Sequence, residues 1–497
     1  MSSDQYLKVL PPKLYLPAAL LVHIMAAWFS LGWQHPDEHY QLIEFARYLL
    51  GEFPSELLPW EFGAGMRPTF QVFIAAATMK AASFAGVSDP FDVIFLLRLM
   101  TGIASTLTLY YWHRQLTFSN KAQSDLHLYL SLWTWALVYT HVRFSSETWS
   151  GMFLILALAV RWNDNRLRQN MIAGVLLGLA FITRFQTGFF IAGYGLFILF
   201  NEENPFRTVI QMAAGFLVIL GMGTALDGYF YGHFVFTPWN YLDQNIFKNV
   251  AASFGTEPWY WYAQKGFEKL IPPFSLLVLG GFGWLVFQKS YRAVGWACMA
   301  FIIGHSLVGH KEWRFLFPLA FFVPLAVTGF WYWLKNQISS VFLTKAFRFT
   351  GQLFIGINAV LLTLVCTQPA YELVKAYRFL YQNAPNPAYL LSEREDPYCS
   401  GNNVAGYFVN PNFVRMPLQS LAFIENLNDG REIFVFTNSH KELPFVKEYN
   451  AVLLYSSFPD WIENVNLNHW LDRSNWYRVY RIPAKNYWDP SRMKPEE

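Results

Sequence analysis

The residues KLYLPAALLVHIMAAWFSLGW (13–33), followed at once by QHPDEHYQ (34–41), form the most informative stretch of this chain. The first part is apolar, long enough to cross a bilayer as a helix, and without a small-residue cleavage site, so we expect it to be retained. The second part places two adjacent acids, Asp37 and Glu38, where the chain leaves the membrane. Charge at that position needs a structural or a chemical explanation.

The residues around these acids predict an amphipathic helix along the membrane surface. Pro36 suits the first position of a helix, and the two acids suit its first turn. One face would carry Leu42, Phe45, Ala46, Leu49 and Leu50, with Glu44, Arg47 and Tyr48 off that face. We expect the acidic start to face water. The acids would then either do chemistry or only cap the helix and complement its dipole, and this segment alone leaves both open.

The composition is that of a polytopic membrane protein. Of 497 residues, 54% are hydrophobic, 19% aromatic and only 14% charged, which is far from soluble averages. Abundant Trp and Tyr are expected in interfacial belts. A net charge of +3 without a Lys/Arg-rich run argues against a nucleic-acid partner. Three cysteines form no disulfide framework.

Apolar runs along the first part of the chain predict about 11 to 13 membrane spans of roughly 17–25 residues each. The runs are 13–33, 69–87, 91–112, 126–142, 147–161, 171–200, 207–228, 273–288, 292–309, 314–334 and 349–368. Basic clusters indicate the cytoplasmic side, which places the loops 34–68, 143–150 and 229–272 on the opposite side.

Two places in this pattern leave alternatives open. The run 171–200 is interrupted by Thr183-Arg184-Phe185-Gln186, which predicts either two short helices or one broken helix. The runs 69–87 and 91–112 cannot both span if Asp37 and Ser145 lie on the same side of the membrane, because the run 126–142 also lies between them, so one of the two would be re-entrant.

After about Tyr371 the sequence predicts a water-exposed α/β domain, so that residues 1–370 form a transmembrane domain and 371–497 an extracytoplasmic one. A domain of about 125 residues is of normal size. The predicted strands are 431–439, 451–458 and 476–482, and the predicted helices lie near 371–382 and 416–427.

The loop 34–68 concentrates ionisable side chains outside the membrane. Beyond Asp37 and Glu38 it contains Trp60, Glu61 and Arg67. The alternative to a catalytic loop is helix capping by the first two acids with surface ion pairs elsewhere.

The segment GHKEWRFLFP (309–318) is wedged between two apolar runs and is a candidate phosphate site. Lys311 and Arg314 supply charged donors, and a guanidinium group can span two phosphate oxygens. His310 and Glu312 stand beside them. The alternative is a short loop whose cationic side chains snorkel to the interface.

Other polar groups are less specific. Arg98 and Arg184 lie inside apolar runs, where an ionisable group marks either a functional site or a pair with a neighbouring helix. Gln186 follows Arg184. The loop 229–272 carries aromatic side chains that would suit a sugar, but interfacial anchoring predicts the same residues and is favoured for 259–262. The polar bend of His141, Arg143 and Glu147 is ambiguous in the same way.

No nucleotide-binding or metalloprotease motif is present, and no paired Cys motif. His35 and His39, at i and i+4, have the spacing to hold a metal together with an adjacent acid. Pro36 lies between them and fixes the helix start, which leaves His35 outside regular helix geometry. We therefore expect no cofactor and no metal, with a divalent ion as the less favoured alternative.

The motifs HPDEHYQ (35–41), Trp60-Glu61, Arg67-Pro68 and HKEWRF (310–315) together resemble one family. It is the eukaryotic-type mannosyltransferase family of GPI-anchor and N-glycan assembly, glycosyltransferase family 22, and the GPI mannosyltransferase III group is the most similar branch. NYL (240–242) and FGTEPWYWY (254–262) also match. The matches keep the family's order over roughly residues 13 to 335, whereas beyond 371 only DPYCS (396–400) matches, and loosely.

The resemblance implies the GT-C fold: an all-α polytopic membrane protein with about 11 to 13 transmembrane helices and a small C-terminal α/β soluble domain. It also implies inverting transfer of a mannose, or another hexose, from a polyprenyl- or dolichyl-phosphate sugar to a lipid-linked glycan or glycolipid. Such a displacement needs a base for the acceptor hydroxyl and stabilisation of the departing phosphate.

The resemblance assigns roles to residues. Asp37 is the expected general base, and Glu38 assists or orients the sugar, although the two roles could be exchanged. His310, Lys311 and Arg314 would hold the donor phosphate, so that cations replace both an acid and a metal. The further substrate-binding candidates are His35, Gln41, Trp60, Glu61, Arg67, Arg184, Gln186, Trp259, Trp261 and Glu312.

Two other functions compete with this interpretation. A lipid or solute transporter or flippase would use Arg98 and Arg184 as pathway charges and would not need Asp37. A GT-C transferase could use another sugar, such as glucose or arabinose. The chain has no Asn-x-Ser/Thr sequon and no di-lysine tail, which favours a bacterial inner membrane with a periplasmic active site. The alternative is the endoplasmic reticulum with a lumenal one.

Overall fold

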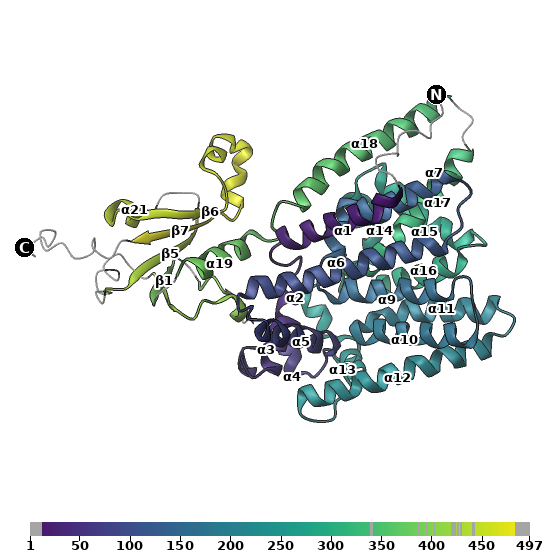
Figure 1. Cartoon of the computed structure of the whole chain (residues 1–497), viewed down its shortest axis with the longest axis horizontal. Coiled ribbons are helices and arrows are strands. Elements are labelled where there is room, and N and C mark those ends of the chain that lie inside the picture. Colours follow the sequence, from purple (N-terminus) through teal and green to yellow (C-terminus); the bar gives the residue numbers. More distant parts are fainter. Residues whose placement is uncertain are drawn as a thin grey trace, which may run out of the picture. The chain divides into compact units, whose positions relative to one another are not determined.

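The chain forms two compact units, which are described one at a time (Figure 1). We use a computed structural model, which describes residues 12–337, 341–384, 387–393, 395–401, 403–418, 424, 427, 430–439 and 443–482. The membrane unit comprises Met1–Ser30, Trp60–Val87 and Val93–Gln368, and the α/β unit comprises Leu31–Pro59, Ser88–Asp92 and Pro369–Glu497.

The membrane unit is helical throughout its described part. It contains, wholly or for the most part, α1 (Pro12–Phe29), α4 (Trp60–Gly63), α5 (Phe70–Phe84), α6 (Pro90–Gln115), α7 (Lys121–Trp133), α8 (Trp135–His141), α9 (Ser146–Arg161), α10 (Leu167–Thr183), η3 (Phe185–Thr187), α11 (Gly188–Asn201), α12 (Pro205–Tyr231), α13 (Thr237–Leu242), η4 (Asp243–Phe247), η5 (Val250–Phe254), α14 (Trp261–Leu270), α15 (Phe274–Phe287), α16 (Arg292–Leu307), η6 (Trp313–Phe322), α17 (Val323–Gln337) and α18 (Val341–Val365).

Several of these helices suit a bilayer. Within the described residues, four stretches are long and apolar enough to cross one: Pro90–Gln115, Pro205–Tyr231, Trp313–Gln337 and Thr344–Val365. Six shorter apolar helices accompany them: Leu14–Phe29, Phe70–Phe84, Leu167–Thr183, Phe185–Asn201, Phe274–Phe287 and Arg292–Leu307. The predicted run 171–200 is two helices, α10 and α11, joined by the short η3.

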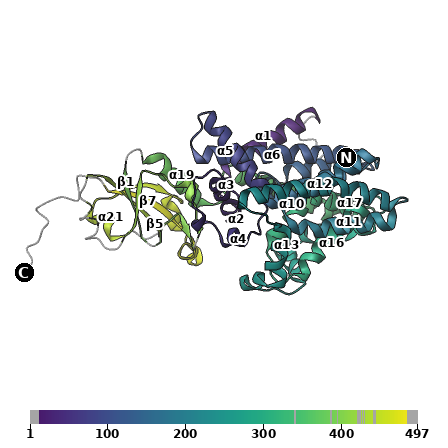
Figure 2. The ribbon, with the colours of Figure 1, turned by 90° about the horizontal axis from the view of Figure 1, so that it is seen from below.

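Glycine allows the closest helix pair of this unit. Helix α10 packs against α9 and α12 (Figure 1), and Figure 2 shows α10 beside α12. A Cβ atom at Gly174 of α10 would lie 1.9 Å from the Met212 carbonyl oxygen, and one at Gly215 of α12 would lie 2.3 Å from the Met171 oxygen. Backbone contact of this kind replaces the hydrophobic effect as the source of helix association inside a membrane.

The α/β unit is built on a mixed sheet. Its elements are α2 (Asp37–Tyr40), α3 (Ile43–Leu49), η2 (Ser55–Leu57), α19 (Glu372–Asn383), β1 (Ala388–Ser392), β2 (Cys399–Ser400), β3 (Asn403–Val404), η7 (Gly406–Phe408), β4 (Phe413–Pro417), β5 (Glu432–Asn438), α21 (Pro444–Glu448), β6 (Val452–Ser456), η8 (Asp460–Val465), η9 (Leu467–Arg473) and β7 (Tyr477–Ile482).

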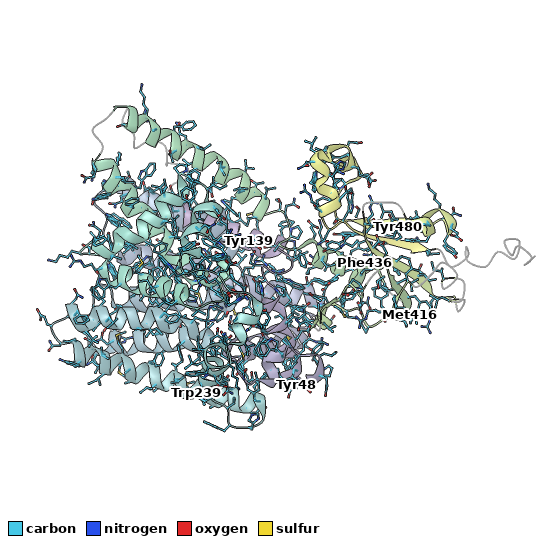
Figure 3. All side chains as sticks on the ribbon, turned by 180° about the vertical axis from the view of Figure 1, so that it is seen from behind. Tyr48, Tyr139, Trp239, Met416, Phe436 and Tyr480 are labelled. Carbon is cyan, nitrogen blue, oxygen red and sulfur yellow. The ribbon has the colours of Figure 1, made fainter. Side chains whose placement is uncertain are left out.

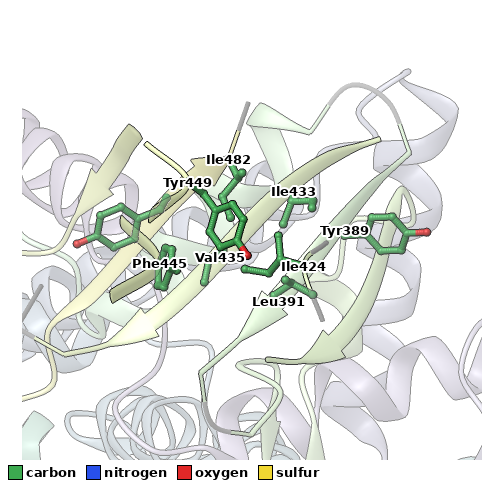
Figure 4. Close-up of a cluster of buried hydrophobic side chains, with 9 residues drawn as sticks. Tyr389, Leu391, Ile424, Ile433, Val435, Phe445, Tyr449 and Ile482 are labelled. Carbon is green, nitrogen blue, oxygen red and sulfur yellow. The ribbon is translucent and has the colours of Figure 1, made fainter. Parts of the chain in front are cut away.

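The five-stranded sheet has the order β4-β1-β5-β7-β6. Strands β4, β1 and β5 are parallel, with Leu390 beside Arg415 and Phe434, whereas β7 runs antiparallel to β5 and β6. The central strands β1 and β5 are buried and the edge strands are largely exposed, as both faces of a parallel sheet must be covered. One core cluster joins side chains of β1, β5 and β7 to Phe445 and Tyr449 (Figure 4).

The three predicted strands, 431–439, 451–458 and 476–482, are confirmed as β5, β6 and β7, and the helix near 371–382 is α19. Strands β1 and β4 were not predicted. The predicted helix 416–427 lies for the most part outside the described residues. The division of the chain into 1–370 and 371–497 stays a prediction, and by compactness Leu31–Pro59 groups with the C-terminal part.

One continuous helix after Pro36 was the wrong prediction. The segment forms two short helices, α2 and α3, separated at Gln41 and Leu42. Glu44, expected off the apolar face, is 1% exposed. The reason is that Glu44 has buried polar partners, which are described below.

Candidate functional site

The residues named from the sequence fall into both units. Asp37 and Glu38 belong to the α/β unit, whereas the segment 309–318 and Arg184 belong to the membrane unit. We describe the two groups separately.

The paired acids stand at the start of α2, and each has a local partner. An oxygen of the Asp37 carboxylate is 3.4 Å from Nδ1 of His35, which also accepts the Asp37 backbone N–H. Glu38 accepts the backbone N–H of Gln34 at 3.2 Å. The Asp37 side chain is 27% exposed. Glu38 thus makes the capping type of contact, while Asp37 is placed at the surface beside an imidazole.

A buried polar network fixes α2 on α3. His39 Nε2 is 2.8 Å from a Glu44 carboxylate oxygen, and Arg47 donates to the other oxygen at 3.1 Å. The backbone N–H of Tyr407 also donates to Glu44. The His39 ring stacks on Phe408 with 4.7 Å between centroids. His39 is therefore committed to Glu44 and not to a pair with His35.

This network also affects Tyr40, the last residue of α2. Burial raises the pKa of the Tyr40 hydroxyl, and the negative charge of Glu44 raises it further. Tyr40 therefore stays neutral in this unit. Gln41 ends the helix, with its backbone N–H bonded to the Asp37 carbonyl.

In the membrane unit, four charged groups and one ring form what we call the arginine cluster: Glu147, Arg184, Glu312, Arg314 and Phe315. Glu147 lies in the first turn of α9, whose N-terminus is capped by Ser145. Arg184 follows the last residue of α10, and Arg314 lies at the start of η6. Segments far apart in sequence thus bring their charges together.

Two arginines share one carboxylate in this cluster. Arg184 Nη1 donates to Glu147 Oε1 at 2.9 Å, and Arg314 Nη1 is 3.5 Å from the same oxygen. Arg314 also donates to both oxygens of Glu312, at 2.6 and 3.2 Å. Both guanidinium groups lie near the Phe315 ring, 5.2 and 5.4 Å from its centroid.

His310 and Lys311 have different surroundings. His310 Nδ1 is 3.1 Å from the Gly255 carbonyl oxygen and its Nε2 is 3.1 Å from a Glu312 carboxylate oxygen. Lys311 donates to the backbone carbonyls of Glu257, Val308 and Gly309. Burial lowers the pKa of the Lys311 amine, and Glu257 opposes that shift.

The Lys311 amine therefore links its own loop to the backbone at Glu257. In contrast, His310 and Arg314 both contact Glu312 of the arginine cluster. The two loops are also joined by the Glu257 N–H, which donates to the Gly309 carbonyl at 2.9 Å.

The remaining candidates of the first loop in this unit have structural partners. Glu61 and Arg67 form an ion pair at 3.1 Å. The Trp60 ring lies 6.4 Å from that of Phe254 and is 44% exposed. Their assignment to substrate stays a prediction.

Asp227, which the sequence analysis did not single out, anchors the end of this loop. Asp227 Oδ1 accepts both the backbone N–H of Thr69, at 2.9 Å, and the Thr69 hydroxyl, at 2.7 Å. The Thr237 hydroxyl donates to its other oxygen. A carboxylate inside the apolar run 207–228 was the signal in the sequence.

Of the remaining candidates, two have hydrogen-bond partners and others have exposed side chains. Arg98 donates to the Ala27 carbonyl of α1 at 2.8 Å, which fits the pairing alternative. Gln186 donates to the Tyr241 hydroxyl. Trp259 and Trp239 are 72% and 54% exposed, and Trp239 is labelled in Figure 3. Trp261 starts α14. Exposure of this kind fits interfacial anchoring and sugar stacking equally.

No group of three or more His, Cys, Asp or Glu side chains suited to a metal occurs among the residues that the structure describes. The absence of a cofactor stays a prediction.

Comparison with known proteins identifies a family. Residues 14–392 match the model of the Alg9-like mannosyltransferase family. The GPI alpha-1,2-mannosyltransferase 3 of Homo sapiens is 26% identical over 326 residues, which are 63% of this chain and 57% of that protein. The GPI mannosyltransferase 3 of Drosophila melanogaster is 24% identical over 60% of this chain and 53% of its own length. The chain thus spans somewhat more than half the length of these relatives.

A solved structure shares the fold. The apo structure of ArnT from Cupriavidus metallidurans aligns with a TM-score of 0.54 over 96% of this chain and 98% of that one, at 11% identity. The same protein bound to undecaprenyl phosphate aligns with a TM-score of 0.53. The apolar helices and this likeness make the chain an integral membrane protein of the GT-C fold with a small C-terminal sheet.

Proposed function

Because the chain belongs to the Alg9-like mannosyltransferase family, we propose that it transfers a mannose from a lipid-phosphate donor to a lipid-linked glycan or glycolipid. The donor would be a polyprenyl- or dolichyl-phosphate mannose. The active face would be periplasmic in a bacterial inner membrane or lumenal in the endoplasmic reticulum. The relatives named as GPI mannosyltransferases support the sugar, and a fold shared with an undecaprenyl phosphate-binding protein supports the lipid phosphate.

The observation that carries this proposal is the arginine cluster. Arg184 and Arg314 come from different segments and converge on Glu147 and Phe315 in a buried environment. Charged donors in such a place stabilise developing phosphate charge without reorganisation. His310 also contacts Glu312, with its Nε2 3.1 Å from a carboxylate oxygen.

The reaction we propose is a single displacement. The acceptor hydroxyl oxygen attacks the anomeric carbon, the bond from that carbon to the phosphate oxygen breaks, and its electron pair leaves on the lipid phosphate. The hydroxyl proton goes to a carboxylate, which we assign to Asp37 because it is partly exposed and His35 lies 3.4 Å from it. A phosphate leaving group stabilised by cations needs no general acid.

The test is mannose transfer by the purified chain from undecaprenyl-phosphate mannose to a synthetic lipid-linked mannoside. Asp37→Asn should lower turnover by about 10²–10⁴-fold, the usual contribution of a positioned base, and leave donor binding unchanged. Asp92→Asn, a surface acid of the same unit near Arg378, is the control and should retain turnover. Undiminished turnover in Asp37→Asn would remove the base assignment, and a loss confined to Glu38→Gln would exchange the two roles.

A further inference from the structure

The Arg184 guanidinium group has one hydrogen-bonded nitrogen and two nitrogens without a partner among the residues that the structure describes. Its Nη1 donates to Glu147 Oε1 at 2.9 Å and to the Ser146 hydroxyl at 3.1 Å. Its Nε and Nη2 are buried and have no hydrogen-bond partner among the residues that the structure describes. The side chain is only 6% exposed. A guanidinium group normally uses all its donors when it is buried, because unpaired donors are costly there.

A second unpaired polar atom lies by the same aromatic ring. His305 of α16 is 3% exposed, and its ring centroid is 6.2 Å from that of Phe315. Its Nδ1 donates to the Phe301 carbonyl, which leaves Nε2 with a lone pair and no partner among the described residues. An acceptor here suits a ligand hydroxyl, while the Arg184 edge suits an anion.

The other cations near this place are already occupied. Arg314 spends its Nε and Nη2 on Glu312. The Lys311 amine donates hydrogen bonds to three backbone carbonyls. Arg184 is therefore the group whose hydrogen-bonding capacity is incomplete within the described cluster.

We propose that the buried Nε–Nη2 edge of Arg184, which lacks partners within the described residues, binds two oxygens of the lipid phosphate, and that Glu147 positions the guanidinium for it. This edge presents two parallel N–H donors at the spacing of two phosphate oxygens, which an ammonium group cannot reproduce. The inference rests on the proposed function, since that function supplies the phosphate. It assigns the main phosphate contact to Arg184 and makes Lys311 a link between loops.

The test compares binding of undecaprenyl phosphate and undecaprenol to the purified full chain, because the two probes differ only in the phosphate. Wild type should bind the phosphate more tightly. Arg184→Gln should lose about tenfold to a hundredfold of that preference, as expected for hydrogen bonds to a charged group, and Arg184→Lys should recover only part of it. The double variant Glu147→Gln/Arg184→Gln leaves no unpaired carboxylate and should show the same loss.

Arg161→Gln is the matched control. Arg161 is a buried arginine of the same unit whose Nε, Nη1 and Nη2 all have partners, so the preference for phosphate should not change. If wild type does not distinguish the two probes, the proposed function fails. If wild type distinguishes them and both Arg184 variants keep the full preference, this inference alone is overturned.

Discussion

The two ends of helix α9 each carry a buried arginine paired with a glutamate, and the two pairs are built differently. At the end of the helix, Arg161 donates to Asn170, to Tyr194 and to both oxygens of Glu202, at 2.5 to 2.9 Å. At the start, Glu147 is shared by two arginines, and Arg184 keeps two buried donors unpaired within the described residues.

The difference separates a structural pair from a binding site. A buried ion pair stabilises a fold only when further hydrogen bonds satisfy the remaining donors. Arg161 meets that condition, and its partners Asn170 and Glu202 tie α9 to the ends of α10 and α11. Arg184 does not meet it. An incompletely paired charge is expected where a ligand completes it, so we propose the start of α9 as the functional end.

The largest expected effect on stability is that of replacing Arg161, which is paired with Glu202. Arg161→Gln leaves Glu202, whose side chain is 19% exposed, without its cation and should lower the free energy of unfolding by about 3 kcal/mol, the lower end of the range for a buried pair. Mannose transfer per folded molecule should stay close to wild type. Thermal unfolding of the protein in detergent, together with turnover normalised to the folded fraction, measures both. A loss of turnover with unchanged stability would contradict the structural role.

For Arg184, whose Nε and Nη2 have no partner among the described residues, we expect a large loss of turnover and a small loss of stability. Arg184→Gln should reduce turnover by about 10²–10³-fold, the effect of removing one preorganised donor from a developing negative charge. Its unfolding temperature should fall less than that of Arg161→Gln, because Arg314 Nη1 remains 3.5 Å from Glu147. Equal loss of stability in the two variants would show that both ends of α9 serve only the fold.

A smaller effect on stability should follow from displacing helix α10, which ends directly before Arg184. Gly174→Ala adds a methyl group 1.9 Å from the Met212 carbonyl oxygen, which forces α10 away from α12. Overpacking of this kind costs about 1–3 kcal/mol. Gly221→Ala is the control, since nothing lies within 4 Å of a Cβ atom there. Both variants are compared by thermal unfolding, and equal unfolding temperatures would contradict the close backbone approach.

The sequence predicted features that depend on local pattern. The break at Thr183–Gln186 and the strands β5, β6 and β7 follow from hydropathy and alternation. The motif 310–315 was also found, and its Arg314 lies in the cluster. Each of these features depends on residues that are close together in the sequence.

Other features depend on partners that are distant in sequence. Glu147 lies 37 residues from Arg184 and 167 from Arg314. The sequence around Glu147 could therefore not be distinguished from an ordinary polar turn. His305 resembled any histidine in an apolar run. Glu44 was placed on the wrong face because its partner Tyr407 lies 363 residues away.

Short strands also escaped prediction. Strand β1, of five residues, is buried on both faces and does not alternate. Its pairing with β4 and β5 supplies the hydrogen bonds that define it as a strand.

The most direct measurement is the passage of labelled mannose to a lipid-linked mannoside, catalysed by the purified chain and offered from two donors. One donor is a lipid-phosphate mannose, offered in its undecaprenyl and its dolichyl form, and the other is a nucleotide-linked mannose. We predict labelled product from the lipid-phosphate donor and none from the nucleotide donor. Product from the nucleotide donor, or no product from either the undecaprenyl- or the dolichyl-phosphate form, would contradict a lipid-phosphate mannosyltransferase.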